Sequence, residues 1–448
     1  MAEQESWTSR IGFIFAAVGS AVGFGNIWSF PFQTASNGGA AFIVVYLVAV
    51  FVIGFPAILV EFVIGRRTKR NPVDAFADLG FGSWAIAGAL GAVTSFATLA
   101  FYSVIGGWVL SYIVGSVTGA YFGDAAAYFG SVASGPIAIA AHAVFMGITI
   151  AVVALGVTDG IERTTKVMVP AVIVLLVGLA AWAFTLPGAA AGYGYYLTPD
   201  FDELAANVAS IVPAAVGQAF FTLSLGFSVM IIYSSYLGHD DSLPADGSAI
   251  VVINTLVAIL AGLVVFPVLF AIGGDVPQEG GSGTAFTALA SAFGQLPAGG
   301  IIGFVFFAVL LFAALSSAIS PLEVPVGYVV QHYGYERSTI AIAMGVVVFL
   351  AGIPPAMGTG ILGWYNAVVF QFLLPLVVLL LIVFVGWVAA DQSFDELGRG
   401  SSLGTTFASA WLWWVRVVVP VGILLTFALG IQSLLVRAGV LASPIFLG

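Results

Sequence analysis

The first chemically informative pattern in this sequence is residues 19–26, GSAVGFGN, which lie inside the apolar stretch 7–32. The three glycines would weaken a helix at this point. If the backbone unwinds within a bilayer, its freed carbonyls and amides need partners from protein, water or a ligand. A small cation suits bare carbonyl oxygens. Close helix packing is the alternative explanation, because small residues at this spacing also let helices approach each other.

A second apolar stretch, residues 212–236, is interrupted in the same way, with Gly217, Thr222, Ser224 and Gly226 near its middle. It lies five apolar stretches after the first. Matching interruptions in the two halves of a chain indicate a transporter built from inverted repeats, with substrate and ions bound near the bilayer midplane. The second interruption therefore favours ligand binding over packing.

Further polar oxygens occur on two other apolar stretches. Asn254 lies early in the seventh stretch, and Ser316 and Ser317 lie within the eighth. Neutral carbonyl, hydroxyl and amide oxygens can replace the water shell of a sodium ion in a site of low dielectric constant. A serine often hydrogen-bonds to its own helix instead. The grouping of these residues on stretches expected to face both interruptions strengthens the sodium hypothesis.

The composition predicts an all-α integral membrane protein, whose helices must position these groups. Of its 448 residues, 61% are hydrophobic and 7% are charged, whereas soluble proteins have about 45–50% and about 25%. Windows of about 20 apolar residues, enough to cross a bilayer, lie near residues 11–33, 40–64, 84–117, 137–157, 166–186, 208–236, 248–273, 300–330, 339–354, 364–389 and 411–436. The first window lacks a small-residue cleavage site, so we expect a retained helix. Without cysteines, the chain has no thiolate metal site.

These eleven windows predict one transmembrane domain over residues 1–448. We expect five plus five helices in an inverted repeat, with the first and sixth helices unwound at the midplane. Repeat one would span about residues 11–186 and repeat two about 208–389, and an extra helix would follow at about 411–436.

The basic residues predict the orientation. With the N-terminus in the cytoplasm, only Arg437 falls outside, as the positive-inside rule requires. The cytoplasmic set is Arg10, Arg66, Arg67, Lys69, Arg70, Arg163, Lys166, Arg337, Arg399 and Arg416. The C-terminus would then be extracellular, in a multi-pass protein of the cell membrane. A net charge of −10 argues against nucleic acid as a partner, which leaves the lipid bilayer and small solutes.

Other classes of membrane protein fit less well. An intramembrane enzyme needs a catalytic pair such as two aspartates or a Ser–His couple, and the spans offer none. A channel needs pore-lining rings or an open polar stripe, which are also missing. A membrane sensor that binds sodium and an amino acid without transporting them stays open as an alternative.

Four segments resemble the neurotransmitter:sodium symporter family. They are residues 7–33 (including GSAVGFGNIW at 19–28), NGGAAF at 37–42, GQAFFTLSLGF at 217–227 and LSSAIS at 315–320. The resemblance covers most of the chain and implies a secondary transporter that is driven by the sodium gradient and works by alternating access. The count of eleven spans is similar to that of shorter prokaryotic members, several of which carry amino acids.

The resemblance implies two sodium sites. The first would use Ala21, Asn26, Thr222 and Asn254, together with a carboxylate oxygen of the substrate. The second would use the carbonyls of Gly19, Val22 and Ala313 and the hydroxyls of Ser316 and Ser317.

The resemblance also implies a site for an amino acid. Carbonyls at Ala21, Phe221 and Thr222 and the Ser224 hydroxyl would meet the amine, while the Gly25 amide and the Tyr102 hydroxyl would meet the carboxylate. The full set of expected substrate residues is Ala21, Gly25, Thr98, Tyr102, Phe221, Thr222, Ser224, Phe227, Ser317 and Pro321. Relatives that carry monoamines have an aspartate where this chain has Gly23, so we expect a neutral L-amino acid with a hydrophobic or aromatic side chain.

Glu61 and Glu323 are carboxylates within the predicted spans, and such groups are costly to bury. The resemblance implies that Glu61 braces the broken sixth helix, whereas it assigns no role to Glu323.

Several positions depart from the family pattern. Ser29 stands where many members have an extracellular gate arginine, and Gln4 and Gln331 occupy the positions of a cytoplasmic ion pair, so we expect no charged gates. Aromatic residues such as Phe221 and hydrogen bonds would then close the site. Ala258 replaces a glutamate or a chloride-binding serine, which leaves chloride dependence undecided.

Overall fold

The computed structural model describes residues 5–238, 241–273, 282–400, 404–443 and 445. Gln4 lies outside the described residues. The regular structure within them is helical, because a chain in lipid must satisfy its backbone hydrogen bonds within each segment.

The first half of the chain, up to the second break, contains these α-helices: α1 Arg10–Ala21, α2 Phe30–Ser36, α3 Ala40–Ala49, α4 Phe55–Thr68, α5 Asp74–Asp78, α6 Ala85–Thr118, α7 Ala125–Val132, α8 Pro136–Ala154, α9 Arg163–Ala183, α10 Ala189–Leu197 and α11 Phe201–Thr222. The second half contains α12 Val229–Ser235, α13 Leu243–Ala271, α14 Ser282–Gln295, α15 Gly299–Tyr333, α16 Arg337–Met357, α17 Thr359–Val368, α18 Leu374–Val383, α19 Ala390–Gly398 and α20 Gly404–Arg437. Short π-helical or 3-10 turns connect some of them: η1 Gly25–Ser29, η2 Val50–Gly54, η3 Gly82–Trp84, η4 Val157–Glu162, η5 Val369–Leu373 and η6 Phe384–Val388.

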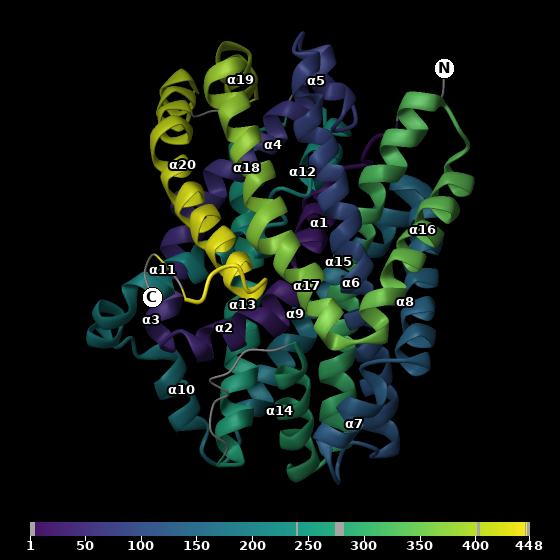
Figure 1. The fold of residues 1–448 in the computed structure, drawn as a ribbon, viewed down its shortest axis with the longest axis vertical. Coiled ribbons are helices and arrows are strands. Elements are labelled where there is room, and N and C mark those ends of the chain that lie inside the picture. The colour runs from purple at the N-terminus through teal and green to yellow at the C-terminus, as the bar shows by residue number, and fades with distance from the viewer. Residues whose placement is uncertain (1–4, 239–240, 274–281, 401–403, 444, 446–448) are drawn as a thin grey trace.

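The number of membrane spans agrees with the prediction. In the part of the chain that the structure describes, ten helices are long and apolar enough to cross a membrane, and the count reaches eleven when the bent pair Arg10–Ala21 and Gly25–Ser36 is taken as one span. Figure 1 shows α1 in the middle of the bundle near α6 and α15, with α20 on the outer flank. The helices α7, α10 and α14 lie at the end opposite to the N-terminus.

The first break is shorter than the sequence suggested. Gly19 is still helical, because α1 continues to Ala21, and the helix resumes at Gly25 with a bend of 49°. The Gly23 amide donates to the Asn26 side-chain oxygen at 3.2 Å. A side chain thus takes the place of the helical acceptor, and this substitution ends the regular hydrogen-bond pattern.

The second break lies between α11 and α12. Ser224, Gly226 and Ser228 have positive φ values of 53°, 78° and 58°, which a right-handed helix cannot contain. Gly226 is required here, since a Cβ at this position would also lie 2.8 Å from the Leu374 carbonyl oxygen. The prediction that Gly217 belongs to the interruption is wrong: it lies inside α11, because a single glycine is tolerated within a helix.

Candidate functional site

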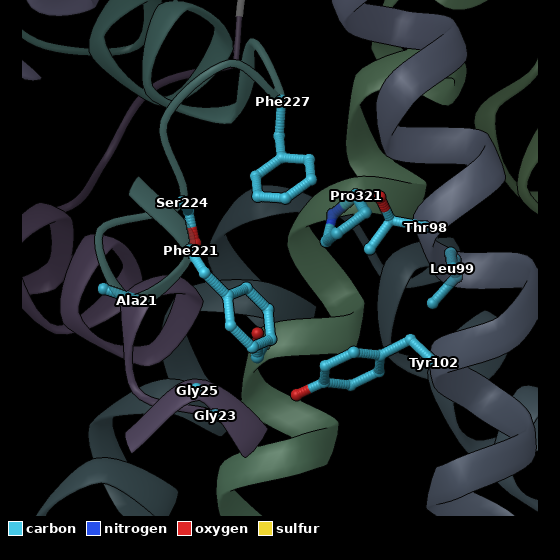
Figure 2. A pocket seen from close by; sticks show the side chains of 11 residues that line it. Ala21, Gly23, Gly25, Thr98, Leu99, Tyr102, Phe221, Ser224, Phe227 and Pro321 are labelled. Atoms are coloured by element: carbon cyan, nitrogen blue, oxygen red, sulfur yellow. The ribbon is translucent and has the colours of Figure 1, made fainter. Parts of the chain in front are cut away.

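A pocket lies between the two breaks and the middle parts of α6 and α15. Its cavity has a volume of about 20 Å³, which is enough for about one water molecule. Its lining, drawn in Figure 2, consists of Ala21, Gly23, Gly25, Thr98, Leu99, Tyr102, Phe221, Ser224, Phe227, Ser317 and Pro321. The structure thus brings together every expected substrate residue except Thr222, and it adds Gly23 and Leu99.

One end of the pocket combines a phenol with the backbone of the first break. The Tyr102 hydroxyl accepts a hydrogen bond from the Phe24 amide at 3.2 Å, and Figure 2 shows the Tyr102 ring pointing from α6 toward Gly23 and Gly25. Gly23 leaves the space for this approach, since a Cβ there would lie 2.6 Å from the Tyr102 hydroxyl. A hydroxyl beside the start of a helical turn suits an anionic group.

The rest of the pocket is uncharged. Phe227, Pro321, Thr98 and Leu99 line this part of it, as Figure 2 shows. The Thr98 hydroxyl donates to the Thr94 carbonyl at 2.6 Å, so only its acceptor lone pairs are left for a ligand. A wall of this kind favours an apolar or aromatic group over a charged one.

Four serines join the two breaks to α15 beside the pocket. The hydroxyls of Ser224 and Ser317 donate to the Ser20 carbonyl at 3.0 and 2.9 Å, and the Ser320 hydroxyl donates to the Ser20 hydroxyl at 2.7 Å. Sequence reasoning did not single out Ser20 and Ser320, although both lie within the family-like segments.

Polar groups also converge near Asn254. One of the two terminal side-chain atoms of Asn254 lies 2.8 Å from the Asn26 amide nitrogen. The same atom lies 3.3 Å from the Ala21 carbonyl oxygen and 3.0 Å from the Thr222 carbonyl oxygen. If this atom is the amide nitrogen, it donates to both carbonyls. If it is the amide oxygen, it accepts a hydrogen bond from the Asn26 amide and also meets two carbonyl oxygens with no hydrogen between them, an arrangement that a cation stabilises.

A second group of oxygens lies where α1 meets α15. The Ser316 hydroxyl donates to the Ala313 carbonyl of its own helix at 3.0 Å. A Cβ built on Gly19 would lie 3.4 Å from the Ser316 Cβ, so that the end of α1 faces this turn directly. The Gly19 carbonyl has lost the amide of Gly23, which donates to Asn26 instead. Val22 follows at the C-terminal cap of α1.

These candidate ligands are neutral. The residues that the structure describes contain no group of three or more His, Cys, Asp or Glu that could hold a metal ion. Carbonyl, hydroxyl and amide oxygens of this kind fit a monovalent cation better than a transition metal, which prefers imidazole or thiolate ligands.

Comparisons with known proteins agree with this geometry. The sequence profile of the sodium:neurotransmitter symporter family matches residues 4–124 and 132–438. The chain belongs to this family. It is therefore a multi-pass, sodium-dependent transporter and not an enzyme.

Individual relatives are similar along most of the chain. An uncharacterised sodium-dependent transporter of Bacillus subtilis, YhdH, is 38% identical over 95% of this chain and 98% of its own. The crystal structure of MhsT in complex with L-phenylalanine has a TM-score of 0.86 and 38% identity, and the match covers 95% of this chain and 99% of MhsT. The human sodium-dependent neutral amino acid transporter SLC6A17 is 28% identical over 60% of this chain and 41% of its own.

The second break of the symporter is held by Glu61. This carboxylate is buried in α4, and its Oε1 accepts a hydrogen bond from the Gly226 amide at 2.8 Å. The resemblance to the family implies a bracing role for Glu61 at this break. The contact satisfies an amide that no longer takes part in a helix.

The Gln218 side chain of α11 connects the two broken helices, because it binds the first and the last residue of η1. Its Nε2 donates to the Gly25 carbonyl at 2.7 Å, and its Oε1 accepts from the Ser29 hydroxyl at 3.0 Å. Ser29 thus joins a neutral bridge at the position where many members of the family have a charged gate residue.

The segment before α1 is fastened to the N-terminal end of the bundle. The Trp7 indole donates to the Tyr233 carbonyl at 2.8 Å, and its ring lies 5.8 Å from the Tyr236 ring. The Thr8 amide donates to Glu162 at 2.9 Å. Together these contacts tie the start of the first helix to α12 and η4.

Charged side chains meet at this end, although Gln4 and Gln331 stand at the positions of the family's cytoplasmic ion pair. Arg337 pairs with Glu5 at 2.9 Å and also with the buried Glu323, which in turn accepts from the Tyr236 hydroxyl at 2.8 Å. Burial raises the pKa of the Glu5 carboxyl above its ordinary value, although Arg337 opposes this effect. Gln331 contributes only a hydrogen bond from the Asn71 amide, at 2.7 Å.

Proposed function

We propose that this symporter moves a neutral L-amino acid with a hydrophobic or aromatic side chain, together with sodium, by alternating access. The observation that carries the proposal is a single pocket with hydroxyl and amide groups at one end and an uncharged, largely apolar wall at the other. The relatives support it, since MhsT was solved with L-phenylalanine and SLC6A17 is named a neutral amino acid transporter.

The ends of the amino acid would take different partners. Its carboxylate would bind the Tyr102 hydroxyl and the Gly25 amide, and its amine would bind the carbonyls of Ala21, Phe221 and Thr222 and the Ser224 hydroxyl. The side chain would lie among Thr98, Phe221, Phe227 and Pro321, with Leu99 as an additional contact. Ser317 lines the pocket next to Gly23.

One sodium ion would occupy the convergence of Asn26, Asn254, Ala21 and Thr222. The substrate carboxylate would complete this site, which makes the binding of ion and amino acid mutually favourable. The close approach of the Asn254 side-chain atom to two carbonyl oxygens supports this assignment.

A second sodium ion would bind between Gly19 and Val22 of α1 and Ala313, Ser316 and Ser317 of α15. Replacing Ser316 or Ser317 by alanine should lower sodium affinity several-fold, because each variant removes one ligand. The melting temperature should change little, since each hydroxyl makes one hydrogen bond, worth about 1 kcal/mol.

Ser320→Ala is the matched control for these variants. Ser320 lies on the same helix and also reaches α1, through the Ser20 hydroxyl, but it is not among the proposed ligands. Sodium titration and thermal unfolding of the three variants separate the two roles. Unchanged sodium affinity together with lower melting temperatures for Ser316→Ala and Ser317→Ala would identify both as packing residues.

Transport distinguishes a symporter from a sensor. We expect purified protein in liposomes to accumulate a labelled hydrophobic amino acid when sodium is high outside, and to lose this ability when a sodium ionophore dissipates the gradient. Binding without any accumulation in the same liposomes would favour the sensor.

We also propose that the N-terminus is cytoplasmic and the C-terminus extracellular, as the basic residues indicate.

A further inference from the structure

Phe370 lies behind the pocket on the π-helical turn η5, which connects α17 to α18. Its ring centroid is 4.5 Å from that of Phe221, with the planes at 60°. On another side it approaches Phe101 of α6, at 6.0 Å and 81°. Aromatic pairs at these separations attract each other beyond simple area burial.

The local sequence fixes the turn that carries Phe370. Pro375 has no backbone N–H, so the Gln371 carbonyl loses the donor that an α-helix would supply four residues later. On the other side, α20 approaches this carbonyl at Gly430, where a Cβ would lie 2.3 Å from it. The wider π-helical turn is therefore held between a proline and a close helix contact. Such turns are frequent at functional sites.

Phe221 lies between this turn and the first break. It lines the pocket and is the residue before the last one of α11, next to the second break. A Cβ on Gly25 would lie 3.4 Å from the Phe221 Cδ1 atom, so the ring rests on the backbone of η1. With η1 on one side and Phe370 on the other, the Phe221 ring has little freedom to leave the pocket.

Among the described residues at Ser29 and at 356–370, no charged pair restrains the pocket in the same way. Ser29 is bound to Gln218, and residues 356–370 contain no acidic side chain. The contact between the Phe370 and Phe221 rings connects the α17–α18 segment to the pocket lining. The Phe221 ring would act as a lid over the ligand. If this lid moves only when the contact with Phe370 opens, the ligand leaves slowly.

We infer that Phe370 is a positioning residue of the substrate site, whose ring holds Phe221 over the bound amino acid and slows its release. The inference rests on the proposed function, since it assumes that an amino acid occupies this pocket. Phe370 thus gives the η5 turn a part in closing the site. The residues of the family-like segments alone do not provide this contact.

The test is the dissociation rate of a labelled amino acid that the wild-type protein binds, measured with sodium present. Phe370→Leu and Phe370→Met both remove the ring and keep an apolar side chain. We expect each to release the ligand about two- to tenfold faster, the range that corresponds to one aromatic pair. Phe370→Tyr keeps the ring and should release at the wild-type rate, and sodium affinity without substrate should stay unchanged in all three variants.

Phe372→Leu is the matched control. Phe372 lies on the same turn, but its ring faces Phe427 of α20 at 5.7 Å and its surface is 37% exposed. Its replacement should leave the release rate unchanged. Wild-type release from both ring-less variants, or an equal acceleration in Phe372→Leu, would overturn the inference. A wild-type protein that binds none of the twenty amino acids would instead refute the proposed function.

Discussion

An amine that lacks a carboxylate is expected to bind at least about a hundredfold more weakly than the matching amino acid. Without the carboxylate, the Tyr102 hydroxyl loses its proposed acceptor, and the sodium ion near Asn26 and Asn254 loses an anionic oxygen. Each buried polar group left unpaired costs about 1–3 kcal/mol, and more when a charge is involved. Two such losses sum to about 2–6 kcal/mol, with the charged group toward the upper end, and so reach the about 2.8 kcal/mol of a hundredfold difference, at about 1.4 kcal/mol per factor of ten.

The described residues that line the pocket include no side chain that could replace this carboxylate. Monoamine carriers that the chain resembles have an aspartate at the position of Gly23. Here a Cβ at position 23 would lie 2.6 Å from the Tyr102 hydroxyl, 2.7 Å from the Ser317 Cβ and 2.8 Å from the Ser317 hydroxyl. The space that an aspartate needs is therefore already filled.

Competition binding measures this discrimination directly. Tryptophan with tryptamine, and phenylalanine with phenethylamine, are matched pairs that share the aromatic group and differ in the carboxylate. The amino acid of each pair serves as the control for the side chain. Similar affinities within a pair would mean that the carboxylate is not recognised and that our interpretation of Gly23 is wrong.

The positions of the two breaks could be predicted to within a few residues, but their lengths could not. Glycine content suggested an interruption from Gly19 and again at Gly217, yet both residues are helical. The actual breaks depend on hydrogen bonds and dihedral angles that a composition does not reveal. Examples are the Asn26 side chain at the first break and the positive φ of Ser224 and Ser228 at the second.

Most pocket residues could be predicted because they belong to segments with a family pattern. Leu99 was missed, since a leucine in an apolar helix carries no signal of its own. Its place three residues before Tyr102 would have put it on the same face of α6 as that residue. Phe370 was missed for a different reason, because its contact with Phe221 depends on the path of a distant π-helical turn.

Long-range ion pairs could not be predicted either. Glu323 had no assigned role, since nothing local in the sequence shows that it meets Arg337 and Tyr236. Arg337 follows only after the turn that ends α15, and Glu5 comes from the other end of the chain. The predicted absence of a charged cytoplasmic gate rested on Gln4 and Gln331, and this reasoning did not consider the charged residues nearby, Glu5, Glu323 and Arg337.

Substrate binding is expected to require sodium. Because the carboxylate of the amino acid completes the proposed site at Asn26, Asn254, Ala21 and Thr222, each ligand raises the affinity for the other by the same factor. Potassium is larger and would not fit oxygens spaced for sodium, so it should not substitute. Coupling free energies of about 1–3 kcal/mol are typical, which correspond to about 5- to 150-fold, and a shared ligand favours the upper end.

The most direct measurement is a titration of purified protein with its amino acid in sodium chloride and in potassium chloride at equal ionic strength, preceded by a screen of the twenty amino acids in sodium chloride. We expect saturable binding in sodium chloride and no measurable binding in potassium chloride. Saturating amino acid should raise the affinity for sodium by the same factor by which sodium raises the affinity for the amino acid. Equal affinity for the amino acid in the two salts would contradict a shared sodium and substrate site between the two helix breaks.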